Sequence, residues 1–359
     1  MMEKLSVWCC PACHGRLVLV DRATRLECTR CGATFETFAD VPDLRIDRPS
    51  WIDVDEDRET ALRLLRDTRT QSLEEMIRHA FAAQPGRTTA QIETRTRQVL
   101  AAPDRLAMQM RDWLRDAALT PGFLDLGCGP GMLLCAAARY GVSGFGVDDS
   151  LVWLAVAKRM IEEHGGRATL CAAHAESLPM ADGTAPAVVS LDVIEHVGDQ
   201  HRFLAEIDRI AAPAAPIALS TPNRFSLAAE PHVGVWGVGW LPVRFQERYV
   251  RARSGRSYAY VRLLSVPGFA RLVRRYTSIA GKFLVPRIPD DEIDAFAPRR
   301  AMLARMYNRV AGSPLLRWPL IGTTRDVALP IRTVRDDGTT APRPAKSPPR
   351  APTHPPLSS

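Results

Sequence analysis

Residues 123–131 read Phe-Leu-Asp-Leu-Gly-Cys-Gly-Pro-Gly, a short apolar segment followed by glycines at alternate positions. An Ala-rich run from Met132 comes next, so the pattern predicts a strand, a tight turn and a helix. Because glycine has no Cβ, backbone amides in such a turn can approach a ligand beside the helix N-terminus. A second apolar segment ends in Asp148, about 20 residues further on, where a carboxylate can meet ribose hydroxyls. Together the two features predict a nucleotide-like cofactor.

The spacing of the glycines separates two classes of cofactor. A dinucleotide site has G-x-G-x-x-G over a pyrophosphate, whereas this chain has D-x-G-x-G-x-G from Asp125 to Gly131. With Asp148, Ala-His-Ala-Glu-Ser-Leu-Pro at 173–179 and Ser-Leu-Asp-Val-Ile-Glu-His-Val at 190–197, the pattern resembles class I S-adenosylmethionine-dependent methyltransferases of the small-molecule, type 11-like kind. The resemblance covers residues 118–223. It implies an α/β fold, a doubly wound Rossmann-like sheet of seven strands.

The resemblance also implies which residues hold S-adenosylmethionine. The glycine loop holds the methionine end in that family, and the acid after the second strand holds the ribose. The family usually has Asp-Ala-Glu at the adenine, but His174 replaces the first acid here, which leaves Ala175 and Glu176. The candidate cofactor residues are therefore Asp125, Gly127, Gly129, Gly131, Asp148, Ala175, Glu176 and Asp192.

The first 47 residues carry a metal-ligand pattern. Two C-x-x-C knuckles, Cys10 with Cys13 and Cys28 with Cys31, have the spacing of a structural zinc site, in which four thiolates complete a closed tetrahedron. Gly15 and Gly32 follow the knuckles, where we expect turns with positive φ. Segments 16–20 and 25–27 predict a hairpin, and 33–38 a third strand. The whole resembles the zinc-ribbon-like domain of tRNA-methyltransferase activator proteins. A disulfide or redox pair is the alternative.

Composition limits the class of protein. The 359 residues are enough for two or three domains, and no apolar run approaches the roughly 18–20 residues of a spanning helix. With no secretion signal at Met1–Leu5, we expect a cytoplasmic protein. Residues 244–359 contain 22 Lys and Arg against 8 Asp and Glu. This basic half could attract RNA, anionic lipid or a phosphorylated substrate, or it could be an ordinary solvated surface.

Patterning along the chain predicts four parts. These are a zinc ribbon at 1–47, a helical arm at 48–117, a methyltransferase domain at 118–335 with a lid and insertion at 225–326, and a disordered tail at 336–359. Alternating strands and helices over 123–220 predict a parallel sheet, with ligands at the carboxyl ends of its strands. We expect a strand at 278–285 and a final antiparallel strand at 327–334.

Two histidines are the candidate catalytic bases. Methyl transfer to a hydroxyl needs alignment with the methyl group and removal of a proton. His196 follows the fourth strand, where the resembling family often places a residue over the substrate pocket, and His232 lies in Glu230-Pro-His232. Either histidine could instead have a purely structural role. Trp236 and Trp240 could form a substrate lid, contact a membrane surface or pack in the core.

Three functions follow from these features. The leading one is methylation of a small-molecule hydroxyl on a glycan, a lipid-linked compound or another secondary metabolite. An rRNA or tRNA methyltransferase is the second, since zinc domains also precede some of those enzymes; residues 191–194, however, read Leu-Asp-Val-Ile and lack the Asn-Pro-Pro-Tyr-like element of many base-methylating enzymes. The third is a non-catalytic, cofactor-binding scaffold.

Overall fold

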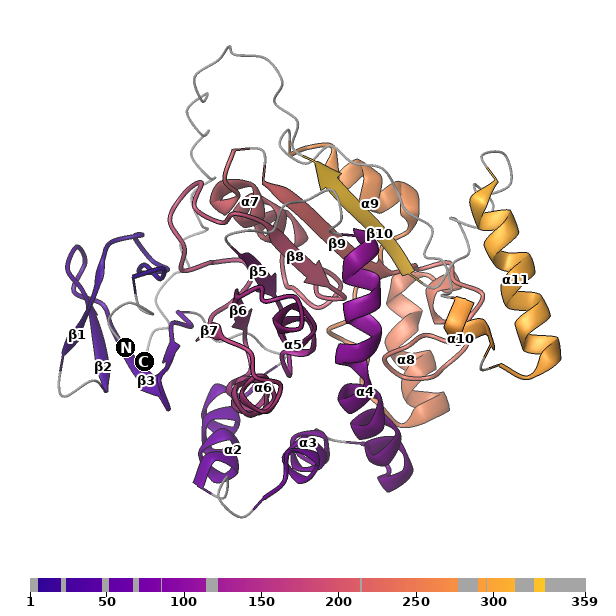
Figure 1. The fold of residues 1–359 in the computed structure, drawn as a ribbon, viewed down its shortest axis with the longest axis horizontal. Helices are drawn as coiled ribbons and strands as arrows, with labels where there is room; N and C mark the ends of the chain where they lie inside the picture. Colours follow the sequence, from indigo (N-terminus) through magenta and orange to yellow (C-terminus); the bar gives the residue numbers. More distant parts are fainter. Residues whose placement is uncertain are drawn as a thin grey trace, which may run out of the picture.

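A computed structural model describes residues 6–20, 24–46, 52–66, 71–84, 86–113, 122–213, 215–276, 290–294, 296–313 and 326–332. Ten strands form one sheet in the order β1-β2-β3-β4-β7-β6-β5-β8-β9-β10, and helices cover both of its faces (Figure 1). The predicted α/β class is confirmed.

The N-terminal ribbon, which carries the four cysteines, supplies one end of this sheet. Its strands are β1 (Leu17–Val20), β2 (Arg25–Cys28), β3 (Thr34–Phe38) and β4 (Val41–Asp43), each antiparallel to the next. The predicted hairpin and third strand are therefore confirmed. The sequence did not predict that β4 pairs in parallel with β7, where Asp43 lies opposite Ala172. The ribbon thus continues the main sheet.

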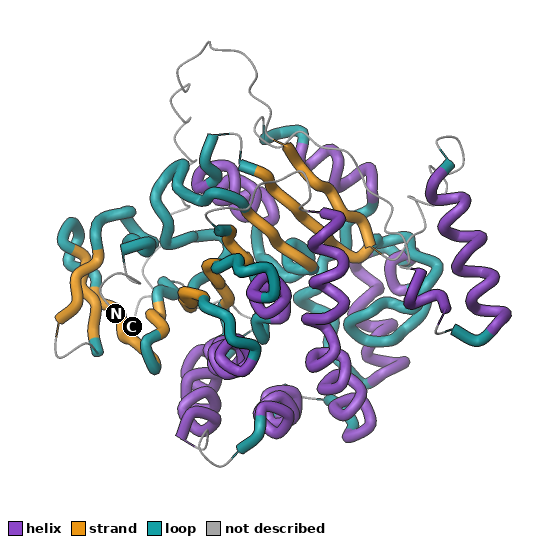
Figure 2. Tube along the Cα trace, viewed as in Figure 1, coloured by secondary structure: helices purple, strands orange, loops and turns teal. Residues whose placement is uncertain are grey.

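The central strands are parallel, as the alternating pattern predicted. They are β5 (Phe123–Leu126), β6 (Gly144–Asp148), β7 (Ala168–Ala172), β8 (Val188–Leu191) and β9 (Pro216–Pro222), and Figure 2 shows them between the helical layers. The expected antiparallel strand is β10 (Asp326–Arg332), paired with β9. The strand expected at 278–285 lies outside the described residues. The chain winds from β5 to β7 in one direction and from β8 to β9 in the other, so the topological switch point lies beside β5.

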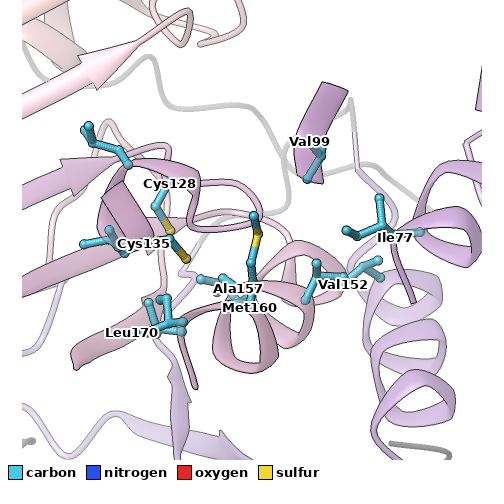
Figure 3. Packing of buried hydrophobic residues seen from close by; sticks show 14 of the residues in the cluster. Ile77, Val99, Cys128, Cys135, Val152, Ala157, Met160 and Leu170 are labelled. Carbon is cyan, nitrogen blue, oxygen red and sulfur yellow. The ribbon is translucent and has the colours of Figure 1, made fainter. Parts of the chain in front are cut away.

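Two layers of helices enclose the sheet. One face carries α2 (Val54–Arg66), α3 (Leu73–Ala82), α4 (Thr89–Trp113), α5 (Met132–Ala138) and α6 (Leu151–Glu163), and the other carries α7 (Gln200–Ile210) and α9 (Val266–Val273). Fully buried Phe123, Cys135 and Met160 belong to the first core, part of which Figure 3 shows. Phe203 and Phe269 belong to the second. Packing in these two cores holds the central strands in place and thereby positions the residues at their carboxyl ends.

The segment after β9 forms a separate, smaller core. It contains the 3-10 turn Val238–Trp240 and α8 (Val243–Ser254), a helix that the sequence did not predict because its composition is so polar. Beyond it lie α10 (Asp290–Asp294) and α11 (Pro298–Gly312). None of the described helices is both long enough and apolar enough to span a bilayer.

Candidate active site

The glycine loop leaves β5 and enters α5 in the conformation that glycine favours. Gly127, Gly129 and Gly131 have φ of 77°, 49° and 78°. A Cβ on Gly127 would lie 2.2 Å from a methyl group of Val193, whereas one on Gly129 would meet nothing within 4 Å. The first glycine is therefore required by close packing, and the second lies under open space.

Two carboxylates flank this loop at the carboxyl ends of β5 and β6. Asp148 accepts hydrogen bonds from the backbone N–H groups of Gly129 (2.7 Å) and Ser150 (3.0 Å). Asp125 is only 4% exposed, and its Oδ2 has no hydrogen-bond partner among the described residues. Burial and the charge of Asp148 raise the pKa of Asp125 to about 8. Burial and Asp149 raise the pKa of Asp148 to about 7.

These features fit S-adenosylmethionine on physical grounds. A buried carboxylate oxygen without a partner suits a cationic group, and the cofactor carries an ammonium and a sulfonium. The open space over Gly129 admits a ligand against the backbone. Ala175 follows β7, whose Ala172 lies opposite Asp148, so it shares the same edge of the sheet. Glu176 instead accepts hydrogen bonds from the N–H groups of Gly198 (2.8 Å) and Asp199 (3.2 Å), and thereby holds the loop before α7.

Asp192 occupies a strained turn directly after β8. It is exposed and has φ of +58°, which is uncommon for a residue with a side chain. Ser220 Oγ donates to its Oδ1 at 3.0 Å, and its own N–H donates to the Ser220 carbonyl. The turn sends Val193 over the glycine loop and brings Glu195 and His196 to the same strand ends.

A cluster of two histidines and two buried glutamates lies beside this turn. Glu195 is fully buried, and its Oε2 accepts a hydrogen bond from Thr221 Oγ1 at 2.9 Å. Its Oε1 lies 3.5 Å from His232 Nε2 and 3.9 Å from His196 Nε2. Glu230 contacts Nδ1 of His232 through its Oε1 and accepts from the His232 N–H through its Oε2. The two imidazole rings meet edge to face with centroids 4.5 Å apart.

The two histidines differ in charge. Burial opposes a charge on His232, but the neighbouring carboxylates of Glu195 and Glu230 outweigh it and raise the pKa of His232 to about 9. Burial and the neighbouring charge of His232 lower the pKa of His196 below 6.5. At neutral pH the cluster therefore contains a protonated His232 and a neutral His196 that can accept a proton.

The same side chains could share a cation. Ligand atoms of Glu195, His196 and His232 lie within 4.8 Å of one another. Imidazole nitrogens with a carboxylate are a common donor set for divalent transition metals. The sequence pattern indicated His196 and His232 separately, but it did not show that two loops bring them together.

The four cysteines of the ribbon also converge. Their sulfur atoms lie within 4.8 Å of one another, with Cys10 and Cys31 at 3.7 Å and Cys13 and Cys28 at 3.4 Å. Zn–S bonds of about 2.3 Å in a tetrahedron require S–S separations of about 3.8 Å, so the donor set fits zinc. Gly32 has the expected positive φ, but at the first knuckle it is His14 that has it. Gly15 is required for space instead, because a Cβ there would lie 2.9 Å from Cys28 Sγ.

A buried ionic network joins the ribbon to the cofactor loop, which is the turn of residues 148–150 between β6 and α6. Arg45, whose side chain is 1% exposed, pairs with Asp43 and Asp57 and donates to the Asp149 carbonyl at 2.9 Å. Asp57 of α2 accepts from Ser150 Oγ at 2.7 Å and from the Leu151 N–H at 2.8 Å, so it caps the N-terminus of α6. Neither Arg45 nor Asp57 lies in a sequence motif, so neither was predicted.

A separate cavity lies between the ribbon and α6. Trp8, Val41, Lys158 and Leu170 are among its lining residues. Its β7 residues begin at Ala168, the amino end of that strand, whereas the cofactor residues lie at the carboxyl ends. The cavity is thus distinct from the candidate site.

Comparison with known proteins identifies the central part of the chain. Residues 124–219 match the family model described as a methyltransferase domain. Ubiquinone biosynthesis O-methyltransferase of Maricaulis maris is 37% identical over 123 residues, which cover 33% of this chain and 48% of that protein. Norajmaline N-methyltransferase of Rauvolfia serpentina is 34% identical over 99 residues, covering 27% of this chain and 34% of that protein. The chain thus spans about half or less of the length of these relatives.

Among solved structures, geranyl diphosphate C-methyltransferase from Streptomyces coelicolor, in complex with S-adenosyl-L-homocysteine, aligns with a TM-score of 0.42 and 15% identity, covering 64% of this chain and 76% of that one. The matched family model spans β5 to β9, which carry the glycine loop, Asp148 and the Glu195–His196 turn. Residues 124–219 of this chain are therefore a methyltransferase domain.

Proposed function

We propose that this protein transfers a methyl group from S-adenosylmethionine to a hydroxyl of a small molecule, such as a glycan, a lipid-linked compound or a secondary metabolite. The observation that carries the proposal is the position of His196: its Nε2 lies 3.9 Å from the buried Glu195 carboxylate, in the turn after β8 whose Val193 packs on the glycine loop. A hydroxyl must lose its proton as it is methylated, and a neutral imidazole can accept it. The similarity to ubiquinone biosynthesis O-methyltransferases supports oxygen as the accepting atom.

The cofactor supplies an electrophilic methyl group on a sulfonium. In this proposal Asp125 faces its cationic end, the loop from Gly127 to Gly131 lies along its methionine part, and Asp148 accepts from the ribose hydroxyls. The partnerless oxygen of Asp125 and the open space at Gly129 support this orientation. Ala175 would lie near the adenine, and Glu176 and Asp192 would act by shaping the surrounding turns.

The histidine cluster holds and moves the proton. His196 would accept the acceptor's proton, and the imidazolium formed would lie 3.9 Å from the Glu195 carboxylate, which stabilises the new charge. His232 stays protonated between Glu195 and Glu230, and its positive charge would stabilise the negative charge that develops on the acceptor oxygen as His196 takes the proton. His232 is then an electrostatic group and His196 the base.

The first test is calorimetric titration of S-adenosylmethionine and S-adenosylhomocysteine into zinc-replete protein. We expect micromolar binding that Asp148→Asn weakens at least about tenfold, because a carboxylate–hydroxyl hydrogen bond contributes about 1.5–3 kcal/mol. Asp182→Asn is the matched control, since Asp182 is exposed and pairs with Arg209 away from the loop. Absence of binding to the wild-type protein would overturn the proposal and favour a scaffold.

Transfer itself is tested with cofactor labelled on the methyl group. Label should pass to phenolic or sugar hydroxyls in a panel of small molecules, and not to bulk tRNA or rRNA. Label found only in RNA would replace this proposal with the nucleic-acid alternative that the basic C-terminal half left open.

A further inference from the structure

A group of exposed apolar side chains gathers between the end of β9 and α8. We call it the lid patch; its members are Leu227, Trp236, Trp240, Val243 and Phe245, which are 61%, 63%, 52%, 65% and 46% exposed. Single exposed apolar residues are common on soluble proteins, but a cluster of aromatic and aliphatic groups marks an interaction site.

Hydrogen bonds hold the tryptophan side chains of the lid patch in defined positions. Trp236 Nε1 donates to the Leu227 carbonyl at 3.0 Å, and Trp240 Nε1 donates to the Ser226 carbonyl at 3.4 Å. Tyr249 Oη donates to the Trp236 carbonyl at 3.0 Å, which ties the patch to α8. Both indole N–H groups therefore bind inward, while more than half of each side chain stays open to the outside.

Positive charge surrounds the lid patch. Residues 225–262 contain six arginines and only two acids, Glu230 and Glu247. Glu230 is buried against His232, and Glu247 pairs with Arg251. Arg244 and Arg248 are exposed on α8 with no acidic partner among the described residues, and Arg244 lies over the Phe245 ring. An apolar patch with this charge complements an anionic surface.

The lid patch is continuous with the candidate active site. The segment that carries Trp236 also supplies Glu230 and His232, and the Glu230 N–H donates to the Val235 carbonyl at 2.9 Å. Arg224, which follows β9, donates to the carbonyls of Gly239 (2.8 Å) and Leu241 (3.1 Å). The lid patch and His232 therefore belong to one hydrogen-bonded segment that packs against the end of β9.

We propose that the lid patch docks on an anionic phospholipid membrane and that the methyl acceptor is an amphipathic molecule dissolved in that membrane. The second clause rests on the proposed function; the docking does not. Tryptophan rings favour the interfacial zone of a bilayer, and arginines bind its phosphates. Exposed Leu227 and Val243 favour hydrocarbon over RNA, since aliphatic groups do not stack on bases.

The test is co-sedimentation of the whole protein with vesicles of phosphatidylcholine, alone or with about 30% phosphatidylglycerol. We expect binding to the anionic vesicles that weakens at least about tenfold in Trp236→Ala/Trp240→Ala and in Arg244→Glu/Arg248→Glu. Arg97→Glu/Arg105→Glu is the matched control, because it makes the same charge change on exposed positions of α4. Each variant should keep wild-type affinity for S-adenosylmethionine, which shows that it is folded.

No binding of wild-type protein to anionic vesicles, or an equal loss in the α4 control, would overturn the docking. Tighter binding to single-stranded RNA than to vesicles, lost in the same two variants, would also overturn it and assign the surface to nucleic acid. Vesicle binding without methyl transfer to any amphipathic hydroxyl would leave the docking standing and overturn the amphipathic acceptor, whereas transfer to no small-molecule hydroxyl at all would refute the proposed function.

Discussion

The sheet buries charged side chains near its ribbon end, at β4 and β7, and near its lid end, at β8 and β9. The two ends differ in whether these side chains have all their hydrogen-bond partners. At the ribbon end, Arg45 and Asp57 satisfy each other and the backbone of the cofactor loop. At the lid end, the buried Glu195 Oε1 has no hydrogen-bond partner among the described residues, and the nearest imidazole nitrogen is 3.5 Å away. Complete networks fix one structure, whereas an incomplete one is costly unless a ligand completes it. We therefore expect the ribbon end to serve the stability of the fold and the lid end to serve binding and catalysis.

Loss of zinc is expected to have the largest effect, and at the ribbon end. Cys28→Ser removes one of four ligands from a site whose metal supplies about 10 kcal/mol of folding energy in small zinc domains. We expect no stoichiometric zinc by elemental analysis and a Tm lower by about 10 °C or more. Cys9→Ser is the control, because Cys9 is buried nearby but lies outside the cluster. Full zinc content in Cys28→Ser would contradict the assignment.

Breaking the buried network should be the next largest effect. Arg45→Met leaves Asp43 and Asp57 without their buried cation, which typically costs about 3–5 kcal/mol of unfolding free energy. Because Asp57 caps α6 and Arg45 holds the Asp149 carbonyl, affinity for S-adenosylmethionine should fall as well. Calorimetry and denaturant unfolding measure the two effects.

The control for that variant is Arg58→Ala. Arg58 also pairs with Asp43, but its side chain is 34% exposed and it does not contact the cofactor loop in any described interaction. It should cost less than about 1 kcal/mol and leave cofactor affinity unchanged. Equal losses in both variants would show that the network acts on the fold alone.

The same contrast explains what the sequence could predict. The glycine loop, Asp148 and the four cysteines are local patterns, because turn geometry and metal coordination require particular residues at short spacing. Arg45 and Asp57 act on positions about a hundred residues away, and nothing in their neighbours signals it. The sequence indicated His196 and His232 separately. Their contact depends on how the segment after β9, which carries His232, packs against the turn after β8. Helix α8 was missed because its burial is confined to two residues, Gln246 and Val250.

At the lid end, substitution should change rate more than stability. Without its proton acceptor the His196→Asn variant should lose about 10²–10⁴-fold in kcat, the usual range for a general base. Its Tm should stay close to that of the wild type, because 42% of the His196 side chain is exposed. His201→Asn, on α7, is the control. A kcat within threefold of wild type, roughly 0.6 kcal/mol, would remove His196 from the mechanism.

The pH dependence of kcat/KM sharpens the same assignment. The proposed mechanism requires neutral His196 and protonated His232, so activity should fall as pH drops through a value below 6.5 and again as pH rises through about 9. In His232→Gln the alkaline limb should disappear while the acid limb remains. An alkaline limb that persists unchanged in this variant would show that another group titrates there.

The smallest expected effect concerns Asp125. Its substitution should stabilise the cofactor-free protein but weaken cofactor binding. Its pKa is raised from 3.8 to about 8 in the folded protein, so the fold holds this proton more tightly than the unfolded chain does. Stability is therefore lost as pH rises from about 4 to about 8, and the cost is complete above pH 8. Asp125→Asn should raise the Tm of the cofactor-free protein by about 2 °C or more at pH 8.5 and change it little at about pH 4. It should also weaken S-adenosylmethionine binding, because the carboxylate that faces the cofactor's cationic end is gone. A variant that binds the cofactor as well as wild type would show that this carboxylate is buried for the fold alone.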